Sequence, residues 1–148
     1  MATHASWFDN VMDLDKRKQT IAKALKTLRA FRKRVNFDAI AFRGMSGAIL
    51  APILADRLNV KLLVVRKEEE KTHSDFYVEG SDTPEKYVIV DDFVSSGDTI
   101  RITVRDIADN FPQAKFVGLY LYQSNVYNDG CARSLLDENF PQTELLKG

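Results

Sequence analysis

Apolar and polar positions along the chain follow helical spacing in some segments and form short continuous runs in others. From Asp15 to Val35, apolar residues recur every three or four positions, which predicts an amphipathic helix. After it, short apolar runs alternate with polar turns and with further stretches of helical spacing. The predicted strands are 37–42, 61–65, 87–91 and 115–122, and the later predicted helices are 48–58, one that opens at 95–97, and one or two turns around 132–139.

The order of these elements predicts an α/β fold, with a Rossmann-like, mainly parallel sheet flanked by helices. A long polar segment, 66–84, interrupts the alternation and is predicted to form an arm with a short hairpin at 75–79. In such sheets, ligands bind beyond the carboxyl ends of the strands, near the point where strand order reverses. The turns at Arg43–Gly47 and Asp91–Thr99 each follow a predicted strand, so we expect the functional site there.

Composition narrows the class of protein. With 148 residues, 45% of them hydrophobic and 28% charged, the sequence predicts one soluble globular domain that spans 1–148. No apolar run approaches the roughly 18 residues needed to cross a bilayer, and the N-terminus lacks the pattern of a secretory signal. One cysteine, Cys131, and two histidines, His4 and His73, exclude an internal disulfide and a structural zinc site, so we expect a cytoplasmic protein.

Charge is distributed unevenly although the formal net charge is zero. Residues 1–35 contain nine basic and three acidic side chains, and all nine basic ones lie within Lys16–Arg34, which has no acidic residue. We interpret this basic helix face as a solvated surface, or as one that meets an acidic neighbour in a dimer. A surface for nucleic acid is the alternative, and a salt-dependent shift of an RNA or DNA probe would support it.

The segment Val88–Thr99 has the strongest chemical pattern in the chain. A predicted buried strand ends in two adjacent carboxylates, Asp91 and Asp92, and a hydroxyl-rich loop with one glycine precedes a helix. A helix start has unpaired backbone N–H groups and a dipole that favours an anion, and Gly97 permits close approach of the backbone to a ligand. Carboxylates suit sugar hydroxyls and a divalent cation instead. The pattern therefore predicts a site for a phosphorylated ribose, with an ordinary capped turn as the alternative.

This segment resembles the phosphoribosyl pyrophosphate (PRPP) binding signature of type I phosphoribosyltransferases, in which an apolar strand precedes two acids, two apolar residues and a small hydroxyl-rich loop. The resemblance implies that Asp91 and Asp92 hold the ribose hydroxyls and that Asp92 lies near Mg2+. Asp98 departs from the family pattern, in which Gly, Ala or Lys is more common, and we expect its carboxylate to point outward. The loop residues that the resemblance assigns to the 5′-phosphate are Ser95, Ser96, Gly97, Asp98 and Thr99.

Two other segments resemble parts of the same family. Arg43, Gly44 and Met45, after the first strand, are similar to the loop that binds pyrophosphate, although an ordinary turn with Ser46 as N-cap explains them equally well. The segment from Arg66 to Gly80 resembles the flexible loop that closes over the site during the reaction. The implied catalytic residues are Asp91, Asp92 and Lys67, and the implied contacts from the flexible loop are Arg66, Lys67, Lys71 and His73.

The family transfers the 5-phosphoribosyl group of PRPP to a nucleobase and releases pyrophosphate. The resemblance therefore implies a Mg2+-dependent phosphoribosyltransferase of nucleotide salvage that forms a homodimer. A PRPP-sensing regulator that binds nucleic acid, built on the same fold, is the alternative.

The accepted nucleobase is predicted from what this chain lacks. Members that bind 6-oxopurines have a lysine after the fourth strand, where this chain has Leu121-Tyr122-Gln123, and an acidic loop residue where it has Ser95. We therefore expect a purine, of the adenine type or another, rather than hypoxanthine, guanine or xanthine. Candidates for a hood over the base are Trp7 and Phe8, or Tyr122, Tyr127 and the tail.

Overall fold

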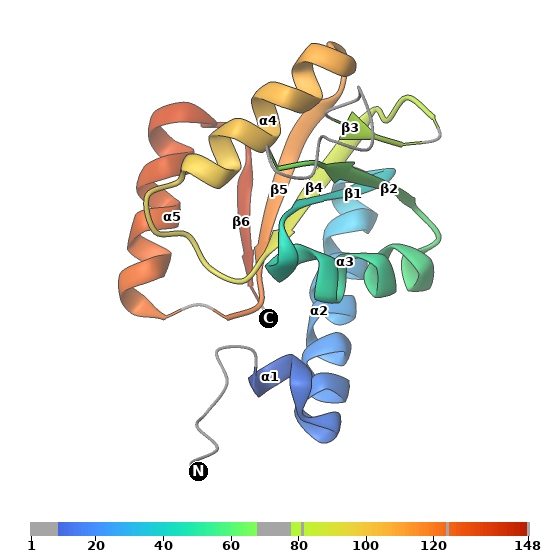
Figure 1. Cartoon of the computed structure of the whole chain (residues 1–148), viewed down its shortest axis with the longest axis vertical. Coiled ribbons are helices and arrows are strands. Elements are labelled where there is room, and N and C mark those ends of the chain that lie inside the picture. The colour runs from blue at the N-terminus through green and yellow to red at the C-terminus, as the bar shows by residue number, and fades with distance from the viewer. Residues whose placement is uncertain (1–8, 68–77, 81, 124, 148) are drawn as a thin grey trace.

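The computed structural model describes residues 9–67, 78–80, 82–123 and 125–147, and within them six strands form one sheet in the order β3-β2-β1-β4-β5-β6 (Figure 1). β3 is antiparallel to β2, and all other neighbouring strands of this sheet are parallel. The strands are β1 Ala39–Arg43, β2 Lys61–Val65, β3 Val78–Glu79, β4 Lys86–Asp91, β5 Lys115–Leu121 and β6 Glu144–Lys147. The helices are α1 Asp9–Met12, α2 Leu14–Val35, α3 Met45–Leu58, α4 Asp98–Asn110 and α5 Val126–Asn139. The fold class predicted from the sequence is confirmed.

Two helices cover each face of the sheet (Figure 1). Apolar residues of α2 and α3, among them Leu28 and Leu54, pack with Ile40 on one face. Apolar residues of α4 and α5, among them Ile107, pack with Ile89 on the opposite face. Strands buried on both faces read as continuous apolar runs, which is why the sequence pattern located them.

The tail of the chain is more regular than the sequence predicted. Residues 132–139 were expected to form only one or two helical turns, but α5 begins at Val126, where Asn125 accepts a hydrogen bond from the Asn128 amide at 2.9 Å as its N-cap. The pattern is weak because few positions of α5 are apolar and buried. β6 was not predicted, since only Leu146 of its four residues is buried; pairing with β5 makes it a strand.

The strand order reverses beside β1. From β1 the chain passes through α3 to β2 on one side, and after β3 it continues to β4 on the other side of β1. Ala41 pairs with Ile89 in the β1–β4 register, so continuing by two residues places Arg43 beside Asp91 at the carboxyl edge. This is the switch point at which open α/β sheets bind ligands.

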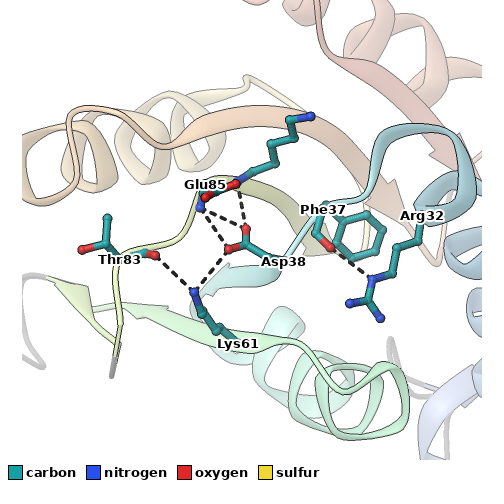
Figure 2. A network of polar contacts seen from close by, with 7 residues as sticks. Arg32, Phe37, Asp38, Lys61, Thr83 and Glu85 are labelled. Carbon is teal, nitrogen blue, oxygen red and sulfur yellow. Dashed lines mark hydrogen bonds and ion pairs between the residues drawn. The ribbon is translucent and has the colours of Figure 1, made fainter.

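At the amino-terminal ends of the strands, opposite the switch point, one carboxylate joins three strands. Asp38, just before β1, accepts hydrogen bonds from the backbone amides of Glu85 and Lys86 and from Lys61 Nζ, at 2.9–3.3 Å (Figure 2). Burial acts to raise the pKa of Asp38, but these hydrogen bonds outweigh it and lower the pKa below its usual value. Nearby, Arg32 of α2 donates to the Phe37 carbonyl at 3.2 Å (Figure 2). These contacts fix the amino ends of β1, β2 and β4.

Several sequence predictions fall on residues outside the described part of the chain. They concern Lys71 and His73 of the polar arm, most of its expected hairpin, and Trp7 and Phe8. Of that arm, β3 pairs Val78 with Val65 of β2. None of the helices within the described residues combines the length and apolar character that a membrane span requires.

Candidate functional site

A cavity of about 270 Å³ opens at the carboxyl edge of the sheet, where β1, β2 and β4 end and α4 begins. It brings together both turns that the sequence singled out. Residues from the turn after β1 and from the segment after β2 face residues from the turn after β4. The lining residues that the sequence predicted are Arg43, Gly44, Met45, Lys67, Asp91, Asp92, Ser95, Ser96, Gly97 and Thr99.

Asp91 and Asp92 form the centre of this site. Both are buried, with 8% and 7% of their surfaces exposed. An oxygen of Asp91 accepts the Asp92 amide at 2.9 Å, and Asp92 accepts the Phe93 amide at 2.8 Å and the Ser46 hydroxyl at 3.2 Å. Burial, followed by the neighbouring Asp92 charge, raises the pKa of Asp91 to about 8, and Lys67 opposes part of this rise. Such a pair needs hydroxyl donors or a cation to be ionised together.

The residues present fit Mg2+ bound jointly with a substrate. Among the described residues, no group of three or more His, Cys, Asp or Glu side chains could hold a metal. Mg2+, however, is usually bound through one or two carboxylates together with waters and substrate phosphates. Asp92 and Asp91 provide those carboxylates at the cavity wall.

The turn after β1 provides a cationic side to the cavity. Gly44 has φ +86°, and a Cβ there would lie 2.7 Å from Lys67 Cε, so the glycine both permits the turn and leaves room for the lysine. Arg43 lines the same cavity, and its buried Nε has no hydrogen-bond acceptor among the described residues. α3 then starts at Met45, three residues earlier than predicted, with Gly44 as its N-cap. Ser46 therefore lies inside the helix instead of capping it.

The loop after β4 lines the part of the cavity that is predicted to bind an anion. Gly97 has φ +87°, and a Cβ there would lie 2.8 Å from Leu135 Cδ1. α4 begins at the next residue, so its first amides lack intrahelical acceptors. Ser95, Ser96 and Thr99 line the cavity, but Asp98 does not: its carboxylate pairs with Arg101 at 3.1 Å. Asp98 points outward, as expected.

The other predicted contacts of the flexible loop are one described residue, Arg66, and two residues that the structure does not describe. Arg66 does not line it, and instead pairs with Glu79 at 2.8 Å, across β2 and β3. Lys71 and His73 lie outside the described residues. Of the described residues in the predicted flexible loop, which are 66, 67 and 78–80, Lys67 alone lines the cavity.

Sequence reasoning did not assign two residues that hold the site together. Ser46 lines the cavity and donates to Asp92, while its carbonyl accepts the Tyr122 hydroxyl at 2.6 Å. Burial, followed by the charges of Asp92 and Asp91, raises the pKa of Tyr122. Ser46 falls inside the predicted turn, where the sequence analysis considered it only as an N-cap. Tyr122 was named only as a candidate for the hood over the base, because its bond to Ser46 depends on how β5 lies beside β4.

The basic side chains of α2 are separate from this site. Four of them, with Arg57 of α3, line another cavity of about 720 Å³ over an apolar floor, and none of its residues lines the site described above. A role in nucleic-acid binding stays a prediction. The four basic residues of α2 are Lys18, Lys26, Arg29 and Lys33.

Solved structures with the same fold are phosphoribosyltransferases. The chain superposes on adenine phosphoribosyltransferase from Saccharomyces cerevisiae with a TM-score of 0.70 and 17% identity, over 95% of this chain and 82% of that one. Orotate phosphoribosyltransferase from Aeropyrum pernix gives 0.67 and 16%, over 96% and 75%. The Mycobacterium tuberculosis orotate enzyme, in complex with 5-phospho-α-D-ribosyl 1-diphosphate, gives 0.60 and 14%, over 91% and 77%. A sequence search of curated proteins found no match.

The family is established by sequence. A family model described as PRTase-CE matches residues 4–141, which is most of the chain. This match agrees with the fold that the chain shares with the solved phosphoribosyltransferases. The chain belongs to the PRTase-CE family and has the fold of the type I phosphoribosyltransferases.

Proposed function

We propose that this protein transfers the 5-phosphoribosyl group of PRPP to a ring nitrogen of a nucleobase and releases pyrophosphate, in nucleotide salvage. The observation that carries the proposal is one cavity that a buried acid pair shares with Arg43 at the end of β1, with Lys67 after β2 and with the loop that starts α4. An activated ribose has the matching groups: two ring hydroxyls, a pyrophosphate on C1 and a phosphate on C5. The sequence favours a purine as acceptor.

In this reaction, a bond forms between the acceptor nitrogen and ribose C1 while the bond from C1 to the pyrophosphate oxygen breaks. Asp91 and Asp92 would accept hydrogen bonds from the ribose hydroxyls and fix C1 in place. Their negative charge also favours the positive charge that develops on the sugar ring as pyrophosphate departs. Tyr122 acts indirectly, by holding Ser46 against Asp92.

The negative charge of the leaving pyrophosphate would be met by the turn after β1 and by the segment after β2. Arg43 supplies a cation from the first and Lys67 one from the second, and Gly44 keeps the backbone close to the ligand. Mg2+, held by Asp92 and Asp91 together with the substrate, would neutralise further charge on the pyrophosphate. Ser95, Ser96 and Thr99, with the first amides of α4, would bind the 5′-phosphate.

The proposal is tested by incubating the protein with PRPP, Mg2+ and a panel of nucleobases, and measuring nucleotide formation and pyrophosphate release. We expect at least one nucleobase to be converted. The double variant Asp91→Asn/Asp92→Asn should lose turnover while its circular dichroism spectrum and melting temperature are retained, because asparagine has the size and shape of aspartate and removes no packing contact.

The matched control is Asp137→Asn/Glu138→Gln, which neutralises an adjacent acid pair on the exposed surface of α5. This control should keep full activity. Turnover by the Asp91/Asp92 double variant equal to that of the control would reject the assignment of the ribose site.

A further inference from the structure

A second cavity lies directly beside the acid pair, at the end of β5. It has a volume of about 320 Å³, near the lower end of the ~300–1,000 Å³ usual for small-molecule sites. We call it the Tyr122 cavity. Its walls come from α1, from the first turns of α2 and from the residues that end and follow β5. They are Asn10, Lys16, Gln19, Thr20, Lys23, Tyr120, Leu121, Tyr122 and Gln123.

Backbone hydrogen bonds fix this cavity next to the proposed ribose site. The Tyr122 amide donates to the Asp91 carbonyl at 3.1 Å, and the Gln123 amide donates to the Asp92 carbonyl at 2.9 Å. The Tyr122 hydroxyl reaches Ser46 in the wall of the other cavity. Tyr122 therefore lines one cavity and contacts the wall of the other through its hydroxyl, and the backbone beside this cavity is hydrogen-bonded to the backbone of the acid pair.

The N-terminal helices are anchored to the same place. The Asn10 side-chain amide donates to the Tyr122 carbonyl at 3.1 Å, and the Thr20 hydroxyl donates to the Asn10 carbonyl at 2.8 Å. These bonds hold α1 and the start of α2 over the end of β5. The cavity is thus built by secondary structure on two sides, which favours a fixed shape for a small rigid ligand.

Two oxygens of this cavity's residues have no donor. Asn10 Oδ1 and Gln123 Oε1 are buried, and neither accepts a hydrogen bond within the described residues. A buried carbonyl oxygen without a partner costs about 1–3 kcal/mol, so such groups in proteins are nearly always paired. A ligand that brings N–H donors would satisfy both oxygens, whereas a free phosphate or another pure acceptor would face them unfavourably.

The charge of the cavity adds a second requirement. Lys16 and Lys23 line it, and none of its lining residues is acidic. An anionic group gains from the positive charge of these lysines, and a neutral ligand does not. The negative group would lie toward α2, away from Asp91 and Asp92, because those carboxylates are beyond the opposite wall at Tyr122.

Building on the proposed function, we propose that the Tyr122 cavity is the acceptor site and that it selects a heterocycle with N–H donors and a negative charge. Such an acceptor is either a pyrimidine with a carboxylate or a purine with an acidic oxo group. The sequence predicted a purine, of the adenine type or another, because no lysine follows the fourth strand and Ser95 takes the place of an acidic loop residue. In the structure, Lys16 and Lys23 of α2 line the cavity at the end of β5. A sequence motif that follows the strand does not include residues of α2.

The experiment compares acceptors that differ in charge. PRPP binding in the presence of Mg2+ is first measured by calorimetry, so that loss of PRPP binding is recognised separately. Initial rates are then measured for orotate against uracil, which lacks the carboxylate, and for xanthine against adenine. We expect kcat/KM to favour the charged member of at least one pair by roughly tenfold or more. The orotate–uracil pair tests a pyrimidine carboxylate as the negative group, and the xanthine–adenine pair tests an acidic oxo group of a purine.

Variants of α2 test the named residues. Lys23→Gln should raise KM for the charged acceptor roughly tenfold while leaving KM for PRPP unchanged. Lys16→Glu/Lys23→Glu should reverse the preference within the pair. Lys18→Gln is the matched control, since Lys18 lies on the same helix, is exposed and does not line the Tyr122 cavity.

Equal use of charged and uncharged acceptors, with no effect of Lys23→Gln, would overturn the proposal while leaving the transferase function intact. If PRPP binds but none of the four acceptors is converted, the proposed function fails for them, and binding of orotate and xanthine is followed directly by ligand-observed NMR with PRPP and Mg2+ present. Binding that Lys23→Gln weakens would still support the charged-ligand site. Absence of binding, or binding that Lys23→Gln leaves unchanged, would reject it.

Discussion

At the scale of single residues, the site depends on two glycines, which leave room for neighbouring side chains, as much as on its charged residues. Gly44 and Gly97 both have φ near +87°, and at both a Cβ would collide with a neighbouring side chain. Each is the N-cap of the helix that follows one of the two turns lining the cavity. The glycines therefore set the positions of Lys67 and of the first amides of α4.

Gly44→Ala tests this point. The substitution should lower the free energy of unfolding by about 1–3 kcal/mol, because alanine is strained at this backbone conformation. It should also weaken PRPP binding, because the methyl group would displace Lys67. Urea denaturation and calorimetry with PRPP and Mg2+ measure the two effects.

Gly130→Ala is the matched control. Gly130 lies inside α5, and no heavy atom outside its own helical surroundings lies within 4 Å of a Cβ there, counting the described residues. Alanine should raise the free energy of unfolding by up to about 1 kcal/mol, through its higher helix propensity. PRPP affinity that is equal in the two variants would contradict the role given to Gly44.

At the scale of elements, local patterns in the sequence predicted those that are buried on a regular face. β2 was predicted with the bounds that it has, Lys61–Val65, and α2 to within one residue. The elements that were missed or cut short, β6 and α5, depend on tertiary contacts instead. β6 becomes a strand by pairing with β5, and α5 packs few apolar residues, so neither leaves a strong local signal.

The candidate site follows the same division. Asp91 and Asp92 were predictable because a buried strand that ends in adjacent acids is unusual, and the structure brings them beside Arg43 and Lys67. The parts contributed by α2 and by Tyr122 were not, because they depend on which strands are neighbours. Sequence patterns identify a turn, but they do not tell which side chain of a distant helix lies against it.

Asp38 offers a test at the element scale, because it joins the amino ends of three strands. Asp38→Ala should lower the free energy of unfolding by about 2 kcal/mol at neutral pH, since the backbone amides of Glu85 and Lys86 and the Lys61 side chain lose their acceptor. The lowered folded-state pKa means that the contribution of its charge is present above the ordinary value of 3.8 and is lost as pH falls through the folded-state value.

The difference between wild type and Asp38→Ala should therefore narrow below about pH 4, when both are unfolded with urea at neutral and acidic pH. Asp56→Ala, which removes an exposed carboxylate of α3, should change stability by no more than ~0.5 kcal/mol. A difference that stays constant with pH would show that packing, and not the charge, is what Asp38 contributes.

At the scale of the whole molecule, ligand binding should be visible as stability. A ligand that binds only the folded state raises the free energy of unfolding by about 2.7 kcal/mol at a concentration 100 times its Kd. We expect PRPP with Mg2+ to raise the melting temperature in differential scanning calorimetry. PRPP with EDTA should give a smaller rise, because the acid pair then lacks the cation that compensates its charge. An equal rise in both conditions would exclude a joint metal site.

The same scale applies to assembly and location. A homodimer and a cytoplasmic location stay predictions, and sedimentation velocity would decide the first. The molecule described here has its proposed ribose site within its own strands and turns. We therefore expect PRPP binding to be independent of protein concentration.

The position of Tyr122 has a consequence for how substrate preference can change. Its ring forms part of one cavity while its hydroxyl steadies Ser46 in the other, so substitutions there would disturb both substrates together. Residues on the α2 side, such as Lys23 and Gln19, touch only one cavity. New acceptor preferences should therefore arise through mutations on that helix, where the specificity for the acceptor can change while PRPP binding is retained.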